Sequence, residues 1–361
     1  MPPKKRKAPA ETAAARRADR AAARRKRYPT GAPVPPFKGQ TFLETVSVGV
    51  PSHQDYMRRV QDFLLWTQTH CLPLLGALSL ECAILEYFDH LFWEGHASPE
   101  GEKVWAALKF ADGLGKSGDF LLPRVSRALK GWHRLSPPLT RQPLPWLGLM
   151  GIVGVCLQRG LVTHAACFVL QFTLYLRPGE LMELKVSQVV PPIHPGGGAT
   201  RGVWAFIVRP YEEESSRPGK TGEFDESLLL DDNRLSFLDS FLEVLTQGRS
   251  QDSPLWPFDL AQHQRVLEEC LQVLCLLGLG IELYSLRHGG ASDDFLHRRR
   301  SLLELKDRGR WRSDASVRRY KKSARALKEL EKFPEATLVF CRLVDARLAS
   351  FFMSPEQVPA V

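Results

Sequence analysis

Several signatures of other protein classes are missing from this 361-residue sequence. Its seven cysteines form no CxxC pair and lie mostly inside apolar stretches, which argues against a disulfide framework or a zinc finger. Such cysteines are typical of a reduced compartment, the cytosol or the nucleus. No glycine-rich phosphate loop and no compact cluster of His, Cys or carboxylate residues is present. The sequence therefore predicts neither a metal nor a cofactor.

Long hydrophobic runs are also missing. The two longest, Trp146–Leu157 and Ala165–Leu176, are separated by polar residues including Gln158, Arg159 and His164. Each is shorter than the roughly 20 residues that a helix needs to cross a bilayer. We interpret them as buried helices, and no membrane association is expected.

Net charge is concentrated at one end of the chain. Residues 1–31 contain 11 of the 49 basic residues and two of the 40 acidic ones, so the rest of the chain carries 38 of each sign. An anion-binding surface in that remainder requires segregation of charge. Twelve Lys or Arg lie between Arg298 and Arg325 against three acids, whereas eight acids lie between Glu212 and Asp232 against two basic residues. The first of these segments is a candidate contact for a polyanion.

Residues 1–40 form the first of five predicted regions and have almost no large apolar residue before Tyr28. They cannot bury a core, so a disordered basic tail is expected. Within it, "PPKKRK" resembles a nuclear import signal, which predicts a nuclear protein; the alternative is a solvated tail without an address.

Two domains follow the tail. Residues 41–135 carry helical periodicity, beginning with a helix that Ser52 is expected to cap, and they predict an all-helical domain. The proline-rich residues 136–145 predict a linker. Residues 146–335 predict helices with a small β-sheet in which a hairpin holds Lys220 near its tip. The fold class is thus mainly α with a small sheet, and residues 336–361 add a C-terminal helix and tail.

Four segments of the second domain carry a resemblance: "LYLRPGEL", "SRPGKTGEF", "LYSLRHGGA" and "RGRWRSDASVRRY". In this order they resemble the catalytic boxes of tyrosine recombinases, the phage-integrase family. The "LRHGGAS" and "GRWRS" wording is similar to recombinases of DIRS-type and Crypton transposable elements. The resemblance covers about residues 50–335 and is strongest from 170 onward. It implies a SAM-like helical core-binding domain and a catalytic domain that clamp double-stranded DNA.

The same resemblance implies a set of catalytic residues. This set is Arg177, Lys220, Arg287, Trp311 and Tyr320. In-line cleavage of a phosphodiester needs a nucleophile, charge stabilisation on the non-bridging oxygens and a proton for the 5′ oxygen. Tyr320 would attack, the forked guanidiniums would hold the oxygens, and Lys220 would protonate the leaving group. Trp311 would hold the phosphate through its indole N–H or by packing. A 3′-phosphotyrosine conserves the bond energy, so ATP is not required, and the two arginines would do the electrostatic work that metal ions do in many nucleases.

Three further residues are implied as phosphate contacts or supports: Glu180, Tyr284 and His288. Tyr284 departs from the family pattern, because a histidine is usual three residues before Arg287. A phenol can donate a hydrogen bond but is a poor proton shuttle near neutral pH, and it is also a rival nucleophile. Each residue has a plainer reading as well, such as an ion pair between Arg177 and Glu180 or a core role for Trp311.

The resemblance further implies a tetramer on two DNA sites. An apolar stripe suits docking of the C-terminal helix on a neighbouring copy or, alternatively, on its own domain; it comprises Leu338, Phe340, Leu343, Val344 and Leu348. Two other functions stay open. A domesticated element could keep nuclear DNA binding after losing activity, and a type IB topoisomerase would share the tyrosine and arginines but act as a monomer. The sequence patterns do not predict the target DNA sequence, the host element, the direction of recombination or the accessory proteins.

Overall fold

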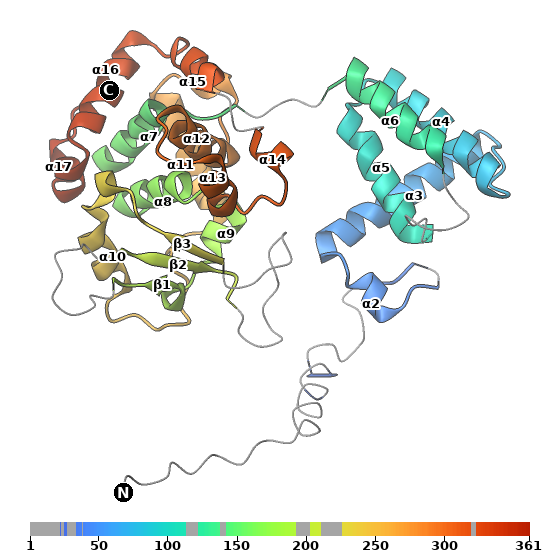
Figure 1. The fold of residues 1–361 in the computed structure, drawn as a ribbon, viewed down its shortest axis with the longest axis horizontal. Coiled ribbons are helices and arrows are strands. Elements are labelled where there is room, and N and C mark those ends of the chain that lie inside the picture. Colours follow the sequence, from blue (N-terminus) through green and yellow to red (C-terminus); the bar gives the residue numbers. More distant parts are fainter. Residues whose placement is uncertain are drawn as a thin grey trace, which may run out of the picture. The chain divides into compact units, whose positions relative to one another are not determined.

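The computed structural model describes residues 22, 25–26, 34–37, 39–112, 122–137, 142–192, 203–210, 226–318 and 323–361. The chain divides into two compact units, Met1–Thr140 and Arg141–Val361 (Figure 1). Across the described residues, no helix combines the length and the apolar character that a membrane crossing requires.

The first unit is helical. Its helices are α2 (Phe42–Thr45), α3 (Val50–Thr69), α4 (Ala77–Trp93), α5 (Ser98–Asp112) and α6 (Pro123–Leu135). Helix α3 begins two residues before the predicted cap: Gly49, not Ser52, is its N-cap, and Pro51 lies in its first turn. Proline suits that position because its missing N–H would have no intrahelical partner there. Buried side chains from α3 to α6, such as Phe63, Ile84 and Val125, form a core of their own.

The second unit contains most of the remaining elements. Its first helices are α7 (Trp146–Gln158), α8 (Val162–Thr173), α9 (Pro178–Met182), α10 (Leu238–Thr246), α11 (Leu260–Val273) and α12 (Leu283–Leu296). They are followed by α13 (Leu302–Arg308), α14 (Asp314–Arg318), α15 (Ser323–Leu330), α16 (Glu335–Ala346) and α17 (Leu348–Met353). Helices α7 and α8 are buried along almost their whole length, which confirms the interpretation of the two apolar runs.

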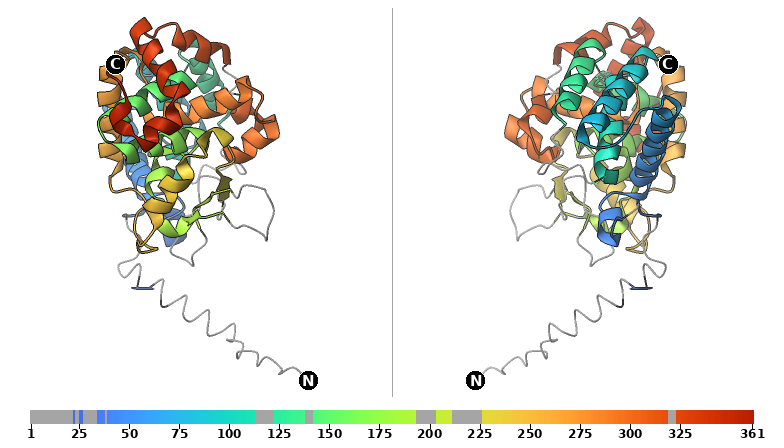
Figure 2. Two further views of the ribbon diagram at one scale, coloured as in Figure 1. Left: turned by 90° about the vertical axis from the view of Figure 1, so that its left-hand side faces the viewer. Right: turned by 90° about the vertical axis from the view of Figure 1, so that its right-hand side faces the viewer.

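Small residues let the C-terminal helix pack closely on α7. A Cβ on Gly151 would lie 2.7 Å from the Cys341 sulfur, and one on Gly154 would lie 2.6 Å from a Val344 methyl. Helix α16 thus lies along α7 of its own chain, as both figures show (Figures 1 and 2). This is the second of the two arrangements expected for the apolar stripe; exchange with a neighbour stays a prediction. The expected single helix is divided at Arg347, which separates α16 from α17.

Three short antiparallel strands form a sheet in the order β1 (Val189–Val190), β2 (Ala205–Val208) and β3 (Glu226–Leu229). Phe206 pairs with Val189 on one side and with Leu228 on the other. These three side chains are buried and join the sheet to the helical core. The fold class predicted from the sequence, mainly helical with a small sheet, is confirmed. The expected hairpin tip with Lys220 lies outside the described residues.

Two buried histidines make the second unit sensitive to acid. The Nδ1 atoms of His164 and His263 lie 3.0 Å apart, and the Phe258 ring stacks on His164. Burial, and then the neighbouring His164, lowers the pKa of His263 to about 3. Below about pH 6.5 the imidazole of His263 is protonated in the unfolded chain, whereas in the folded chain it stays neutral down to about pH 3. The free energy of unfolding therefore falls as the pH falls through this window.

We expect His263→Gln to flatten this dependence, because glutamine keeps a polar side chain but does not titrate. Denaturant unfolding of the full chain should show a loss of about 1.4 kcal/mol per pH unit below pH 6.5 that the variant lacks. An identical slope in both proteins would contradict the assignment.

Candidate active site

The first box residue, Arg177, is held by its own helix start. It is the N-cap of α9, followed by Pro178 in the first turn. Its backbone N–H donates to Glu180 Oε2 at 2.9 Å, and its guanidinium pairs with the other oxygen of the same carboxylate. Burial would lower the pKa of Arg177, but Glu180 and the hydrogen-bonded Tyr284 hydroxyl outweigh it and raise that pKa. The side chain keeps 15% of its surface exposed.

Arg287 lies on α12 with none of its surface exposed. One terminal nitrogen of its guanidinium donates to the Tyr175 carbonyl, and the other donates to the Gly309 carbonyl. Tyr175 precedes Arg177 by two residues, and Gly309 precedes Trp311 by two. The Arg287 fork therefore ties together the segment that carries Arg177 and the segment that carries Trp311.

Trp311 packs directly on this fork. The guanidinium carbon of Arg287 lies 5.0 Å from the indole centroid, within cation–π range, and the Tyr175 ring stacks with the indole at a centroid distance of 6.1 Å. A Cβ on Gly309 would approach the indole to 2.1 Å, so this glycine leaves room for the ring. Trp311 is 9% exposed. Trp311 is thus a core residue, as the alternative interpretation expected, and it also lies beside Arg287, a predicted catalytic residue.

A third guanidinium, which the sequence interpretation did not select, lies at the centre of the group. Arg310 Nη2 is 2.5 Å from Glu180 Oε2, and Arg310 Nε is 3.3 Å from Glu226 Oε2 on β3. Burial lowers the pKa of Arg310 to about 10; Glu180 and Glu226 oppose this shift, while Arg287 and Arg177 add to it. Arg177 and Arg287 therefore both lie close enough to Arg310 to repel its charge.

Glu180 is the carboxylate that holds two of these arginines. It is 5% exposed, and burial would raise its pKa. Arg310 and Arg177 outweigh burial and lower the pKa of Glu180, so the carboxylate stays charged. The expected ion pair between Arg177 and Glu180 exists, and it is part of a larger cluster.

The remaining predicted residues fall into two groups. Tyr284 and His288 are half-buried neighbours on α12, with ring centroids 5.4 Å apart, and Tyr284 contacts Arg177. Lys220 and Tyr320 lie outside the described residues. Within the described part of the chain, no group of three or more His, Cys, Asp or Glu side chains is placed to hold a metal ion.

No protein-family model and no curated protein sequence matches the chain. Among solved structures, the XerH site-specific recombinase bound to a palindromic difH substrate, a post-cleavage complex, is similar with a TM-score of 0.53. It is 13% identical, and the match covers 79% of this chain and 80% of that one. The fold is that of tyrosine recombinases.

Two other similar structures are more distant. A lambda integrase dimer bound to a COC′ core site has a TM-score of 0.48 at 15% identity, covering 78% of this chain and 92% of that one. The XerA recombinase has a TM-score of 0.35 at 13% identity, covering 81% and 96%.

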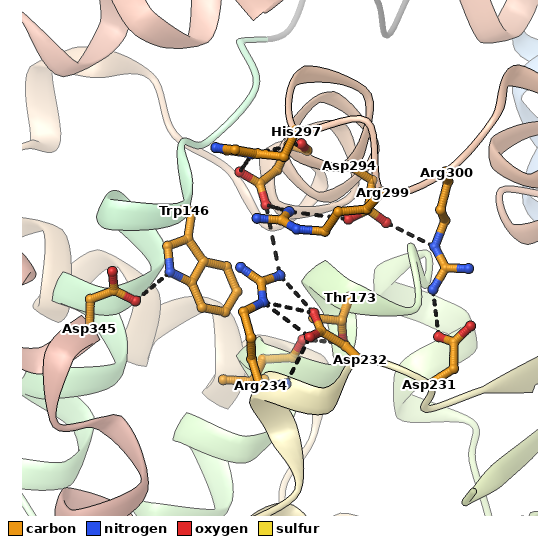
Figure 3. A network of polar contacts seen from close by, with 12 residues as sticks. Trp146, Thr173, Asp231, Asp232, Arg234, Asp294, His297, Arg299, Arg300 and Asp345 are labelled. Atoms are coloured by element: carbon orange, nitrogen blue, oxygen red, sulfur yellow. Dashed lines mark hydrogen bonds and ion pairs between the residues drawn. The ribbon is translucent and has the colours of Figure 1, made fainter.

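Within this tyrosine-recombinase fold, a charged network anchors the helix that carries Arg287 (Figure 3). Arg300 bridges Asp231, after β3, and Asp294, on α12, at 2.5 and 3.0 Å. The Tyr175 hydroxyl donates to Asp294 at 2.5 Å, and Arg308 donates to the Thr173 carbonyl at 2.8 Å. The network connects the end of α12 to the sheet and to the end of α8.

The network changes the meaning of the basic segment that begins at Arg298. Four of its arginines pair with carboxylates of the same unit: Arg299, Arg300, Arg308 and Arg310. Some partners, on α9, on β3 and in the segment after β3, are far away in sequence, whereas those on α12 lie five or six residues before the arginines they bind. The sequence interpretation as one polyanion-binding segment was therefore too broad, because composition does not show which cations are already neutralised. The two acidic pairs in the sequence, Asp231–Asp232 and Asp293–Asp294, were the only hint that these arginines have carboxylate partners.

Proposed function

We propose that the chain is a site-specific DNA recombinase that cleaves and rejoins duplex DNA through a 3′-phosphotyrosine on Tyr320. The observation that supports this most is a convergence: Arg177, Arg287 and Trp311 come from three separate segments and meet around one buried cluster. They do so in a chain with the fold of tyrosine recombinases, in the order in which the family's boxes occur.

The proposed chemistry is a balanced exchange of esters. The Tyr320 phenol gives its proton to solvent and forms a bond to phosphorus while the bond from phosphorus to the 5′ oxygen breaks. The 5′ oxygen takes a proton, which Lys220 supplies. Two guanidiniums offset charge on the non-bridging oxygens, a role that metal ions fill in many nucleases. In the reverse step a 5′ hydroxyl attacks the phosphotyrosine and the strand is rejoined without ATP.

A DNA-binding protein without strand exchange is the second candidate, and one observation favours it. Arg287 has no exposed surface, and both ends of its fork are bonded to backbone carbonyls. A phosphate reaches this guanidinium only if the chain rearranges on binding. Tyr284 in place of the usual histidine supports the same candidate.

Trapping of a covalent complex separates the two candidates. Because the target is not known, the full chain is incubated with nicked suicide duplexes of randomised sequence, and adducts are recovered after denaturation. We expect a protease-sensitive adduct that releases a 5′ hydroxyl strand, with the modified peptide containing Tyr320. DNA binding without any adduct would support the second candidate instead, and relaxation of supercoiled plasmid by a monomer would indicate a topoisomerase.

The proposal extends to assembly and location. We propose a tetramer on two DNA sites, which the resemblance to tyrosine recombinases implies, and import into the nucleus, supported by "PPKKRK". An origin in a DIRS-type or Crypton transposable element is part of the same proposal and is supported by the wording of two boxes.

A further inference from the structure

Arg310 has several properties that a purely structural arginine does not need. Its side chain is 3% exposed, and its backbone has a φ of 52°, in the left-handed region that non-glycine residues rarely adopt. This conformation is the left-handed end of helix α13, closed by the Trp311 N–H, which donates to the Lys306 carbonyl at 3.0 Å. The residue lies between Glu180 on α9 and Glu226 on β3 and directly precedes Trp311.

The hydrogen-bonding capacity of Arg310 is not used up by these contacts. Nη2 bonds to Glu180, and Nε forms an ion pair with Glu226, but Nη1 is buried and has no hydrogen-bond partner among the residues that the structure describes. A buried donor on a charged group is costly to leave unpaired, so native structures seldom contain one without a reason. An acceptor that arrives with the substrate is such a reason.

Charge balance points to the same kind of ligand. Three guanidiniums, Arg177, Arg287 and Arg310, lie near two carboxylates, Glu180 and Glu226, in the described part of the site. The cluster therefore carries one positive charge in excess. Repulsion between the three arginines is relieved when an anion enters, and a phosphodiester supplies one negative charge together with two acceptor oxygens.

We propose that Arg310 is a third phosphate-binding arginine, which donates from Nη1 to a non-bridging oxygen of the phosphodiester under attack. The inference rests on the proposed function and adds a residue to it. Glu180 and Glu226 orient the guanidinium from two sides. Because Nη1 is buried, the phosphate reaches it, as it reaches Arg287, only when the chain rearranges on binding. The position next to Trp311 lets one short segment contribute two groups to the same site.

The test removes charge from each side of the proposed contact. Adduct formation by the full chain is timed on a nicked duplex with a normal scissile phosphate and on the same duplex with a methylphosphonate, in which an oxygen and its charge are replaced by methyl. For Arg310→Met we expect a rate loss of about 100-fold on the phosphodiester and under about 5-fold on the methylphosphonate. A loss of the same size on both substrates would overturn the proposal, because the missing charge would then have no partner in the substrate.

Arg308→Met is the matched control. Arg308 is also a buried arginine of the same segment, but its bonds go to the Thr173 carbonyl and Asp231. Whatever loss this variant shows should be equal on the two substrates.

Arg310→Lys keeps the test decisive if the methionine variant does not fold. Lysine keeps the charge but cannot hold Glu180 and an oxygen in one planar fork, so a loss of about 10-fold, again confined to the charged substrate, is expected. If the unmodified chain forms no adduct on either duplex, the proposed function is wrong and this inference falls with it. An active wild type with equal losses in the variants refutes the inference alone.

Discussion

Tyr320→Phe is expected to abolish the covalent DNA adduct, with a loss of at least about 10⁴-fold in the rate of its formation. Only the phenolic oxygen is removed, so the nucleophile disappears while the ring and the surrounding charges stay. DNA affinity in a gel-shift measurement should change by less than about twofold. Denaturing gels of the nicked-duplex reaction measure the adduct directly.

Tyr284→Phe is the control for this experiment, because Tyr284 is the rival nucleophile of the site. Its hydroxyl contacts Arg177 and helps to raise the pKa of that arginine. Removing the hydroxyl should slow the reaction by about 10- to 100-fold, through loss of one donor, and should leave an adduct on Tyr320. The opposite pattern, an adduct that survives Tyr320→Phe and disappears in Tyr284→Phe, would move the chemistry to α12.

Gly290→Ala is expected to destabilise the second unit by about 3 kcal/mol or more. A Cβ at this position would lie 1.9 Å from the Phe172 carbonyl oxygen and 2.9 Å from the Tyr175 ring. Backbone cannot rotate away as a flexible side chain does, so α8 and α12 would have to separate. The separation would also displace Arg287, and activity should fall together with the midpoint of denaturant unfolding.

Gly278→Ala provides the comparison for this clash. Gly278 lies in the same unit, and nothing stands within 4 Å of the Cβ it would gain. A change below about 1 kcal/mol is expected there, since alanine adds no clash and restricts the unfolded chain. Equal losses in the two variants would show that the close approach of α8 and α12 is not the cause.

The helices and strands followed from periodicity, since α7, α8 and α12 are apolar or patterned enough to be recognised alone. The first and last residues of the helices were harder to predict from the sequence. The start of α3 was set by Pro51 rather than by Ser52, and the break at Arg347 has no proline or glycine to announce it. Local propensity does not determine such positions when tertiary packing decides them.

The ordered pattern predicted that Arg177, Arg287 and Trp311 would lie close together, and the structure places them in one cluster; their catalytic roles stay predictions. The site was not predictable where partners are distant in sequence. Arg310 was visible inside the "GRWRS" motif, but its bonds to Glu180 and Glu226 span 130 and 84 positions of the chain. Nothing in a single sequence reveals which carboxylate folds onto which arginine.

The hydrogen bonds of Arg287 predict which residues a catalytically inactive relative would keep. Its guanidinium fastens the backbone ahead of Arg177 to the backbone ahead of Trp311, so the architecture needs it whether or not a phosphate ever arrives. A descendant under selection only for its shape would retain this side chain. Conservation of Arg287 in a relative is therefore weak evidence that the relative is catalytically active. Conservation of the tyrosine at position 320 is stronger evidence of activity.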